Sequence, residues 1–211
     1  MLITEQINGY EFGILNYDDA QFPELQSVIH DRFVIEGYIN PLPEREIRDE
    51  FITSSIYFCA IDKAFERIVG GFRMISPEAG PLPMQNEFSL YPGIKNELSL
   101  LSPNEYVEIG RLAVLPGYNI AECLYRQGWK HSIAMKHKVW TISADKRLWV
   151  LFRRYRGLIF RQSGEDREYL GSVTTPGIAT LDELAHSMKE KAPRFFSYMN
   201  GPTPDYLYSS P

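Results

Sequence analysis

The sequence has little cysteine and no long apolar run, and these absences exclude several classes of protein. Its 211 residues include two cysteines, Cys59 and Cys123, each within an apolar stretch. Two such thiols indicate neither a disulfide scaffold nor a zinc site. No run approaches the roughly 18 apolar residues that a membrane helix needs, and Met1–Glu5 shows no signal-peptide pattern. We therefore expect a cytoplasmic protein that does not insert stably into a membrane.

Histidine is also scarce, which argues against two kinds of catalytic centre. The four histidines are scattered along the chain: His30, His131, His137 and His186. None lies near a serine or cysteine in a recognisable nucleophile motif. The sequence thus predicts no nucleophilic catalysis and no bound metal, and we expect no permanently bound cofactor.

Length and composition are those of an ordinary globular protein. The chain is 44% hydrophobic and 23% charged, and 211 residues suffice to bury a core without cross-links. No internal repeat or low-complexity block interrupts it. We predict a single domain over residues 1–211.

Positive charge is concentrated in one part of an otherwise acidic chain. The net charge is −5, yet eleven of the 22 Lys and Arg residues lie between Arg126 and Arg167, a window with three acidic residues. Such a field attracts anionic partners, although a solvated basic helix face is an equally good interpretation. Nucleic acid is disfavoured, because no recognition motif is present.

Hydrophobic periodicity predicts an α/β domain with a mixed central sheet flanked by helices. The expected elements are a helix over 18–38 with Asp18 or Asp19 as N-cap, strands at 54–62 and 67–76, a long proline-rich loop at 76–104, a strand at 106–115, a helix at 118–137, a strand at 138–143, a helix at 145–156, a strand at 158–163, a helix at 182–191, and an aromatic tail at about 192–211. Only 106–143 needs a parallel crossover, and ligands bind beyond the carboxyl ends of such strands. The carboxyl end of the 106–115 strand is at Leu115-Pro116-Gly117, where we expect the ligand.

Three short stretches resemble the GNAT superfamily of N-acyltransferases. They are "EIGRLAV" (Glu108–Val114), "GGFRMI" (Gly70–Ile75) and "RDEF" (Arg48–Phe51). Within that superfamily the chain looks most similar to long-chain N-acyl amino acid synthases and acyl-homoserine-lactone (autoinducer) synthases. The resemblance covers roughly residues 20–170 and implies a GNAT-like acyltransferase fold. It also implies that Phe33, Asp49 and Arg73 help to bind the amine substrate.

Three positions depart from the lactone synthases. Ile29, Ile39 and Ile52 stand where those enzymes usually have arginine, tryptophan and a second aspartate. In that family these residues shape the pocket for S-adenosylmethionine. Their absence favours an amino acid or another amine as the acceptor.

Acyl transfer from a thioester to an amine needs a neutral amine, a polarised carbonyl and a slot for the chain. Glu108 and Arg111 are the predicted catalytic residues, with Glu108 as the base that removes a proton from the amine; a partly buried Glu108–Arg111 ion pair is the alternative. Arg73 is expected either to pair with Asp49 or to orient a substrate carboxylate. A bulge near Gly110 would decide which side chains share a face.

The turn after the 106–115 strand bears on the identity of the acyl carrier. Acetyl-CoA enzymes of the superfamily have small residues there, which let backbone N–H groups approach a pyrophosphate. Here Gly117 is present, but Ile120 and Glu122 occupy the following positions. An acyl carrier protein presents phosphopantetheine without that diphosphate, and its acidic surface complements the basic window.

The predicted donor-binding residues are Val114, Leu115, Gly117, Asn119, Arg153 and Arg154. The predicted function is transfer of a fatty acyl group, a long chain as the resemblance implies, from acyl carrier protein to an amino acid or similar small amine. Acyl-CoA remains open as the co-substrate. The alternatives are an acyl-homoserine-lactone synthase, an acetyl-CoA-dependent acetyltransferase, and a non-catalytic acyl- or carrier-binding module.

Overall fold

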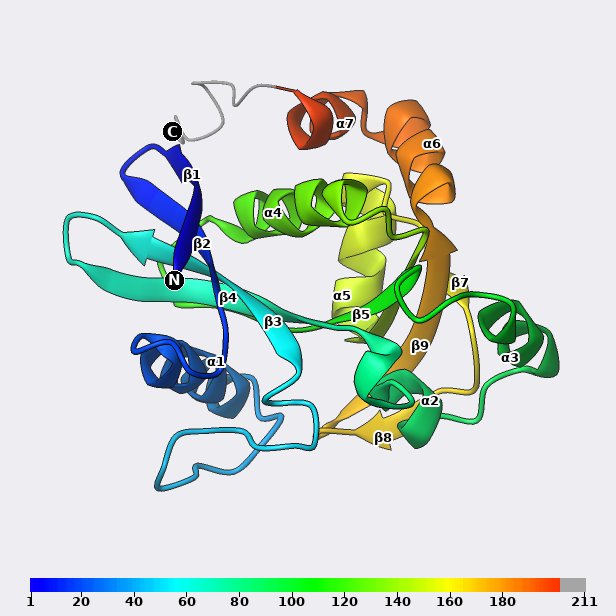
Figure 1. Ribbon diagram of the computed structural model, residues 1–211, viewed down its shortest axis with the longest axis horizontal. Coiled ribbons are helices and arrows are strands. Elements are labelled where there is room, and N and C mark those ends of the chain that lie inside the picture. The colour runs from blue at the N-terminus through cyan, green and yellow to red at the C-terminus, as the bar shows by residue number, and fades with distance from the viewer. Residues whose placement is uncertain (202–211) are drawn as a thin grey trace. The chain divides into compact units, whose positions relative to one another are not determined.

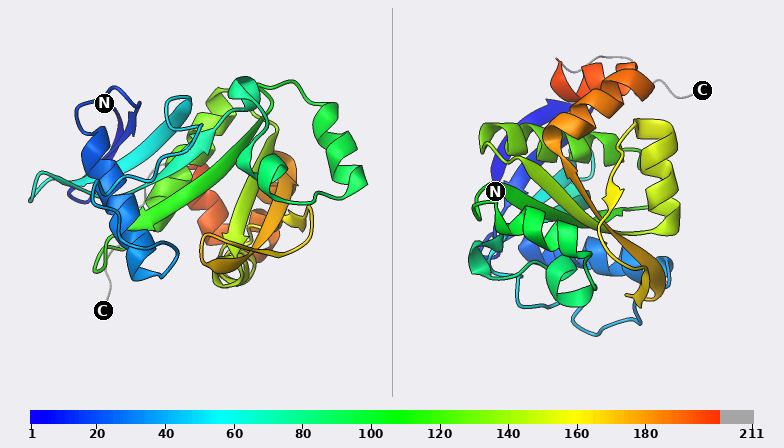
Figure 2. Two further views of the ribbon diagram at one scale, coloured as in Figure 1. Left: turned by 90° about the horizontal axis from the view of Figure 1, so that it is seen from below. Right: turned by 90° about the vertical axis from the view of Figure 1, so that its right-hand side faces the viewer.

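The computed structural model describes residues 1–201 (Figures 1 and 2). The chain divides into two compact units. Of the described residues, the first comprises 1–73, 111–130 and 197–201, and the second comprises 74–110 and 131–196. Among the described residues, no helix is both long and apolar enough to span a membrane. The organisation of residues 1–211 as one domain stays a prediction.

The first unit begins with a hairpin that the sequence analysis did not predict. Strands β1 (Leu2–Ile7) and β2 (Tyr10–Leu15) pair antiparallel. They are joined by Asn8 and Gly9, with φ angles of 47° and 83°. Asn-Gly with both residues at positive φ is the strongest short-range hairpin signal. The signal was therefore present in the sequence.

Two further strands follow β2 as predicted. Strand β3 (Ser55–Asp62) pairs antiparallel with β2, and β4 (Arg67–Ile75) is the next strand in the sheet. The rings of Phe58 and Phe72 stack 4.6 Å apart. A Cβ on Gly71 would lie 2.5 Å from the Phe58 carbonyl oxygen. Glycine there permits the close approach of β4 to β3.

Helix α1 (Phe22–Ile35) covers these strands with its apolar face (Figure 1). The resulting core consists of Leu15, Phe22, Leu25, Val28, Ile29, Phe33, Ile47, Tyr57, Cys59, Ile61, Ile68 and Ala113. The helix begins at Phe22, four residues later than predicted, with Gln21 as the N-cap and Pro23 in its first turn, because proline is pre-organised for that position. Neither Asp18 nor Asp19 is the N-cap; the Asp19 carboxylate instead accepts hydrogen bonds from the Met1 amino group and the Asn16 N–H.

Strand β5 (Tyr106–Val114) and helix α4 (Ala121–Ala134) each contribute residues to both units. In the second unit, β5 pairs parallel with β6 (Val139–Asp145), from Tyr106 opposite Val139 to Ile109 opposite Ile142. This is the predicted crossover, and it is confirmed.

The second unit also contains a strand that was not predicted. Strand β9 (Ser172–Thr180) pairs antiparallel with β6, and the short strands β7 (Arg161–Gln162) and β8 (Arg167–Tyr169) pair with it (Figures 1 and 2). Pro176 and Gly177 within it are strand-breaking signals. Here the Pro176 carbonyl accepts a hydrogen bond from Ser163 N–H at 2.9 Å. The strand predicted at 158–163 is reduced to β7.

The stretch at 76–104, predicted as one long loop, contains three short helices. They are η1 (Pro77–Ala79), α2 (Pro83–Glu87) and α3 (Pro92–Ser99). Each begins with a proline in its first turn, where the missing N–H costs nothing. The prolines that suggested a loop are therefore helix starts. The Tyr91 N–H donates to the Ser163 carbonyl at 2.9 Å, which fastens the stretch to the rest of the unit.

The remaining helices of residues 1–201 lie after β6 and after β9. Helix α5 (Lys146–Leu151) continues into a π-helix, η2 (Phe152–Arg156), which ends at Gly157 with φ 62°. Helix α6 (Leu181–Lys191) begins with a capping box of Thr180 and Glu183. Part of the predicted aromatic tail is helix α7 (Pro193–Asn200); its remainder, with Tyr206 and Tyr208, lies outside the described residues.

Candidate functional site

Two arginines of the first unit share one carboxylate. Arg73 Nη1 lies 2.8 and 2.7 Å from the two Asp49 oxygens, and Arg111 Nη2 lies 2.6 Å from Oδ2. Arg111 Nη1 also donates to the Ile47 carbonyl at 2.5 Å. The structure thus brings together three of the predicted site residues. The pairing of Arg73 with Asp49, left open by the sequence, is present.

The Arg73–Asp49–Arg111 cluster is largely buried. Arg73 is 4% exposed, and the Arg111 and Asp49 side chains are 8% and 28% exposed. The Nε of Arg73 is buried and has no hydrogen-bond partner among the described residues. An unpaired buried guanidinium donor is costly. An anionic group placed at Arg73 Nε would supply the missing acceptor.

The backbone of β5 departs from extended geometry where it presents Arg111. Its φ is +56°, in the left-handed region, which costs roughly 1–2 kcal/mol for a residue with a Cβ. The irregularity predicted near Gly110 therefore falls on the arginine itself. Strain of this kind persists only where surrounding contacts hold it, and the Asp49 and Ile47 contacts do so here.

Glu108 lies in the second unit and is 3% exposed. Its Oε2 accepts the Met84 N–H at 2.8 Å, and its Oε1 accepts the Ser143 hydroxyl at 3.2 Å. Met84 is in the first turn of α2, whose N–H groups have no partner within the helix. The carboxylate is thus fixed in orientation by two neutral donors. Its role as a base remains a prediction.

The turn after β5 keeps one glycine for a backbone reason. Gly117 has φ 89°, a conformation that favours glycine. Leu115 N–H donates to the Val69 carbonyl at 2.9 Å, while Asn119 is exposed and Val114 partly buried. Ile120 is 1% exposed, and its Cδ1 would lie 3.1 Å from a Cβ on Gly70. Ile120 therefore packs within the core of the first unit.

Helix α5 and η2 present a surface that is both basic and apolar, which we term the basic face. Its exposed residues are Lys146, Arg147, Val150, Leu151, Arg153, Arg154 and Tyr155. Lys146 pairs with Asp166 at 3.1 Å, and Arg147 with Asp145 at 3.7 Å. Within residues 1–201, Arg153 and Arg154 form no ion pair. Two uncompensated cations thus lie beside exposed apolar side chains.

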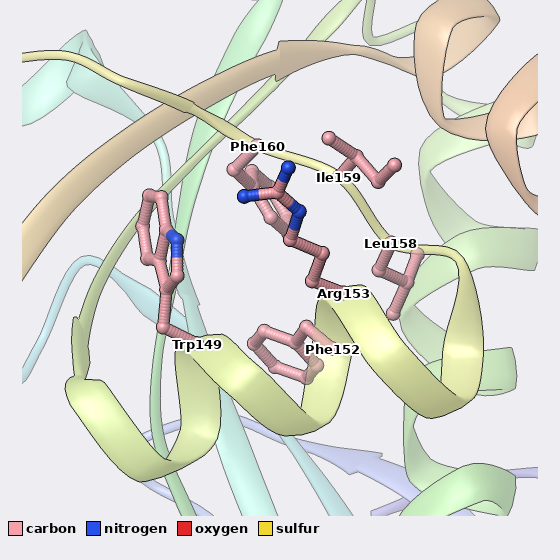
Figure 3. A pocket seen from close by; sticks show the side chains of 6 residues that line it. All are labelled: Trp149, Phe152, Arg153, Leu158, Ile159 and Phe160. Atoms are coloured by element: carbon pink, nitrogen blue, oxygen red, sulfur yellow. The ribbon is translucent and has the colours of Figure 1, made fainter.

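A small hollow opens beside this helix (Figure 3). It is lined by Trp149, Phe152, Arg153, Leu158, Ile159 and Phe160. The Arg153 side chain reaches from the helix over this hollow (Figure 3). The π-helical turn that carries Arg153 is a backbone form often found at functional sites.

Phe33 lies in the core of the first unit, 7% exposed, with its ring 5.4 Å from that of Tyr38. Its substrate-binding role stays a prediction. The sequence did not predict the Ile47 carbonyl, the Met84 amide or the Ser143 hydroxyl as partners of the predicted residues. Two of these are backbone groups, which carry no residue-type signal.

No protein-family profile matches the sequence, and no curated protein matches it. Solved structures are similar to it in fold. FeeM, an N-acyl amino acid synthase from uncultured soil microbes, has a TM-score of 0.65 at 16% identity over 85% of this chain and 94% of that chain. The acyl-homoserine-lactone synthase LasI has a TM-score of 0.64 at 12% identity over 86% and 94%.

The CoA-dependent lactone synthase BjaI, solved with S-adenosylmethionine and isopentyl-CoA, has a TM-score of 0.67 at 15% identity over 93% and 96% of the two chains. These likenesses confirm the predicted fold class, a mixed sheet flanked by helices. The chain has the GNAT-like fold found in N-acyl amino acid synthases and acyl-homoserine-lactone synthases.

Proposed function

We propose that this protein is an N-acyltransferase that moves a long fatty acyl group from acyl carrier protein to the amine of an amino acid or a similar small amine. The observation that carries the proposal is the Arg73–Asp49–Arg111 cluster. The buried Arg73 Nε, which has no hydrogen-bond partner among the described residues, suits the carboxylate of an amino acid acceptor beside the two guanidiniums. A likeness in fold to an N-acyl amino acid synthase supports the same acceptor class.

Two protons leave the acceptor nitrogen, and one of them reaches the thiolate. Glu108 takes the first from the ammonium group, directly or through a water molecule, to give the neutral amine. The amine nitrogen then attacks the thioester carbon, the C–N bond forms, and the C–S bond breaks. The second nitrogen proton passes to the departing thiolate; because a thiol pKa is near 8.5, this step is undemanding. The products are an N-acyl amino acid and the free thiol of the carrier.

Two features support a carrier protein as the donor. Ile120 occupies a buried core position where acetyl-CoA enzymes use small residues. The basic face offers Arg153 and Arg154 to an acidic partner, with Val150 and Leu151 beside them. Charge complementarity of this kind accelerates encounter and selects the partner. The similarity in fold to a CoA-dependent synthase makes acyl-CoA the competing donor.

A lactone synthase is the second candidate function, because LasI and BjaI are as similar in fold as FeeM. Against it, Ile29 is fully buried in the core at a position where lactone synthases usually have an arginine. An isoleucine there provides no polar contact for S-adenosylmethionine.

The deciding experiment supplies the purified protein with a C12–C16 acyl carrier protein and the twenty amino acids, with product detection by mass spectrometry. Parallel reactions replace the carrier by acyl-CoA or the amino acids by S-adenosylmethionine. A long-chain N-acyl amino acid formed from the carrier is the expected result. Formation of an acyl-homoserine lactone would show that the acceptor is S-adenosylmethionine and not an amino acid. Acylation only from acyl-CoA would show that the donor is acyl-CoA and not acyl carrier protein. Absence of any acylated product would overturn the proposal.

The docking surface is tested by the double change Arg153→Glu with Arg154→Glu. We expect KM for the acyl carrier protein to rise about tenfold or more at low salt and kcat to change little, because rim charges act mainly on encounter. Lys189→Glu with Lys191→Glu is the matched control, since both lysines are exposed on α6. Equal KM values in the two double variants would show that the carrier does not dock on the basic face.

A further inference from the structure

A buried histidine of α1 holds the segment that brings Asp49 to the two arginines. His30 is 4% exposed, and its Nε2 accepts the Leu42 N–H at 2.9 Å. Its Nδ1 lies 3.0 Å from Asp31 Oδ1. One neutral tautomer satisfies both contacts, with the proton on Nδ1 donated to Asp31 and the lone pair of Nε2 facing Leu42. The ring is therefore an acceptor for the backbone of the next segment.

Asp31 fastens the same segment a few residues further on. Its carboxylate accepts the Arg45 Nε at 3.0 Å, and its Oδ2 also pairs with Arg45 Nη2. The Arg45 N–H donates to the Leu42 carbonyl at 3.0 Å, and Arg45 has φ +49°. The turn from Leu42 to Arg45 is thus bound at its first residue to His30 and at its last residue to Asp31, and these contacts hold the unfavourable backbone geometry of Arg45. We term residues 42–49 the anchored loop.

The anchored loop ends at the arginine cluster. Two residues after Arg45, the Ile47 carbonyl accepts from Arg111 Nη1, and the Asp49 carboxylate then accepts from both arginines. Ile47 is itself part of the core, 9% exposed. The eight residues from Leu42 to Asp49 therefore connect the His30–Asp31 pair to the carboxylate that Arg73 and Arg111 share. We expect a displacement of Leu42 to shift Asp49, because the Arg45 and Ile47 contacts hold the backbone between these two residues.

We propose that His30 and Asp31 are positioning residues that hold the anchored loop and thereby set the acceptor site from α1. The inference rests on the proposed function in assigning the arginine cluster to the acceptor. The two residues contact Leu42 and Arg45 and act on the site through them. We expect loss of the anchor to weaken acceptor binding and to leave donor binding unchanged, because His30 and Asp31 contact Leu42 and Arg45 in the segment that carries Asp49.

Kinetics of three variants separate positioning from a general structural role. His30→Leu removes the acceptor for Leu42 N–H, whereas His30→Gln places an amide oxygen near the Nε2 position. We expect His30→Leu to raise KM for the amine about fivefold, the effect of one lost hydrogen bond, with KM for the acyl donor unchanged. His30→Gln restores most of the loss. Equal effects on both KM values, or no recovery in the glutamine variant, would overturn the inference.

A second variant, Arg45→Ala, and a measurement of amide hydrogen exchange test the anchor even if His30→Leu fails to fold. The Arg45 side chain is 52% exposed, so Arg45→Ala should leave the packing of the hydrophobic core unchanged. We expect faster amide hydrogen exchange in residues 42–49 for both His30→Leu and Arg45→Ala. Arg48→Ala is the matched control, because Arg48 is 69% exposed and pairs with Glu46 within the same loop.

The exchange measurement also keeps the two proposals apart. If the protein acylates no amine, the proposed function fails and exchange alone decides whether α1 anchors the loop. Unchanged exchange in residues 42–49 of both His30→Leu and Arg45→Ala would overturn the anchor, whatever reaction the protein catalyses.

Discussion

Replacement of Glu108 by glutamine isolates its chemistry from its structural contacts. Glutamine has the same shape, its oxygen can accept the Met84 N–H, and its NH₂ can donate to the Ser143 hydroxyl, which accepts as well as donates. We therefore expect the free energy of unfolding to change by less than about 1 kcal/mol. Glu108→Ala, in contrast, leaves the buried Met84 N–H unpaired, at a cost of about 1–3 kcal/mol.

The catalytic effect of the same change is expected to be much larger. General base catalysis contributes typically 10²–10⁴-fold, so single-turnover acyl transfer at pH 7 should slow by about that factor, or about 3–5 kcal/mol in the barrier. The deficit should shrink as the pH rises through about 8, where an α-amino group loses its proton without help.

The assay is transfer from a preloaded acyl carrier protein, quenched in time and measured by mass spectrometry. Glu105→Gln is the matched control: Glu105 lies three residues earlier and pairs with Lys138 at the surface. A rate for Glu108→Gln within twofold of the unmodified protein would refute Glu108 as the base. If Glu105→Gln slows acyl transfer as much as Glu108→Gln does, the effect comes from removing a negative charge and not from removing a base.

Three further changes test the packing and charges around the site. Asp49→Asn should lower the free energy of unfolding by about 1–3 kcal/mol, because two largely buried guanidiniums lose their counter-charge, as measured by urea denaturation. Gly71→Ala should destabilise by about 1–3 kcal/mol, since its Cβ would lie 2.5 Å from a backbone oxygen, whereas Gly93→Ala meets nothing within 4 Å and should leave stability unchanged. Burial, with a smaller contribution from His131, lowers the pKa of His137 to about 4. Between about pH 6.5 and 4 the unfolded chain therefore binds a proton that the folded chain does not. The free energy of unfolding should decrease as the pH is lowered through that window. His137→Asn should flatten this dependence in urea titrations at pH 7 and 5, and the exposed His186→Asn should not.

Part of the fold was predictable because local patterns and final structure agree. The periodicity of α1, the β-branched strand β3 and the order β5-α4-β6 reflect burial of one face, which the residue sequence records. The prolines at 77, 83 and 92 had a second interpretation, as first-turn residues of helices. Choosing between loop and helix there depended on contacts such as Tyr91 N–H with the Ser163 carbonyl, more than 70 residues away in the chain.

Strand β9 shows why tertiary context overrides propensity. Pro176 and Gly177 are poor strand residues, yet β9 pairs with β6 along its length and with β7 and β8 as well. The Trp149 ring would lie 2.7 Å from a Cβ on Gly177, so glycine leaves room for that ring. Pairing with neighbouring strands and packing of a distant side chain, neither visible in the local sequence, fix this element.

The sequence alone determined the fold class, the parallel crossover and the residue types of the candidate site. These follow from the hydrophobic pattern and from motifs around Asp49, Arg73, Glu108 and Arg111. The tertiary structure alone decided that Asp49 is shared by both arginines, that Glu108 accepts hydrogen bonds from Met84 and Ser143, and that His30 accepts the Leu42 N–H of the segment that leads to Asp49. The reason is physical: a motif specifies which groups are present, whereas their charges, hydrogen-bond partners and burial depend on segments that meet only after the chain has folded.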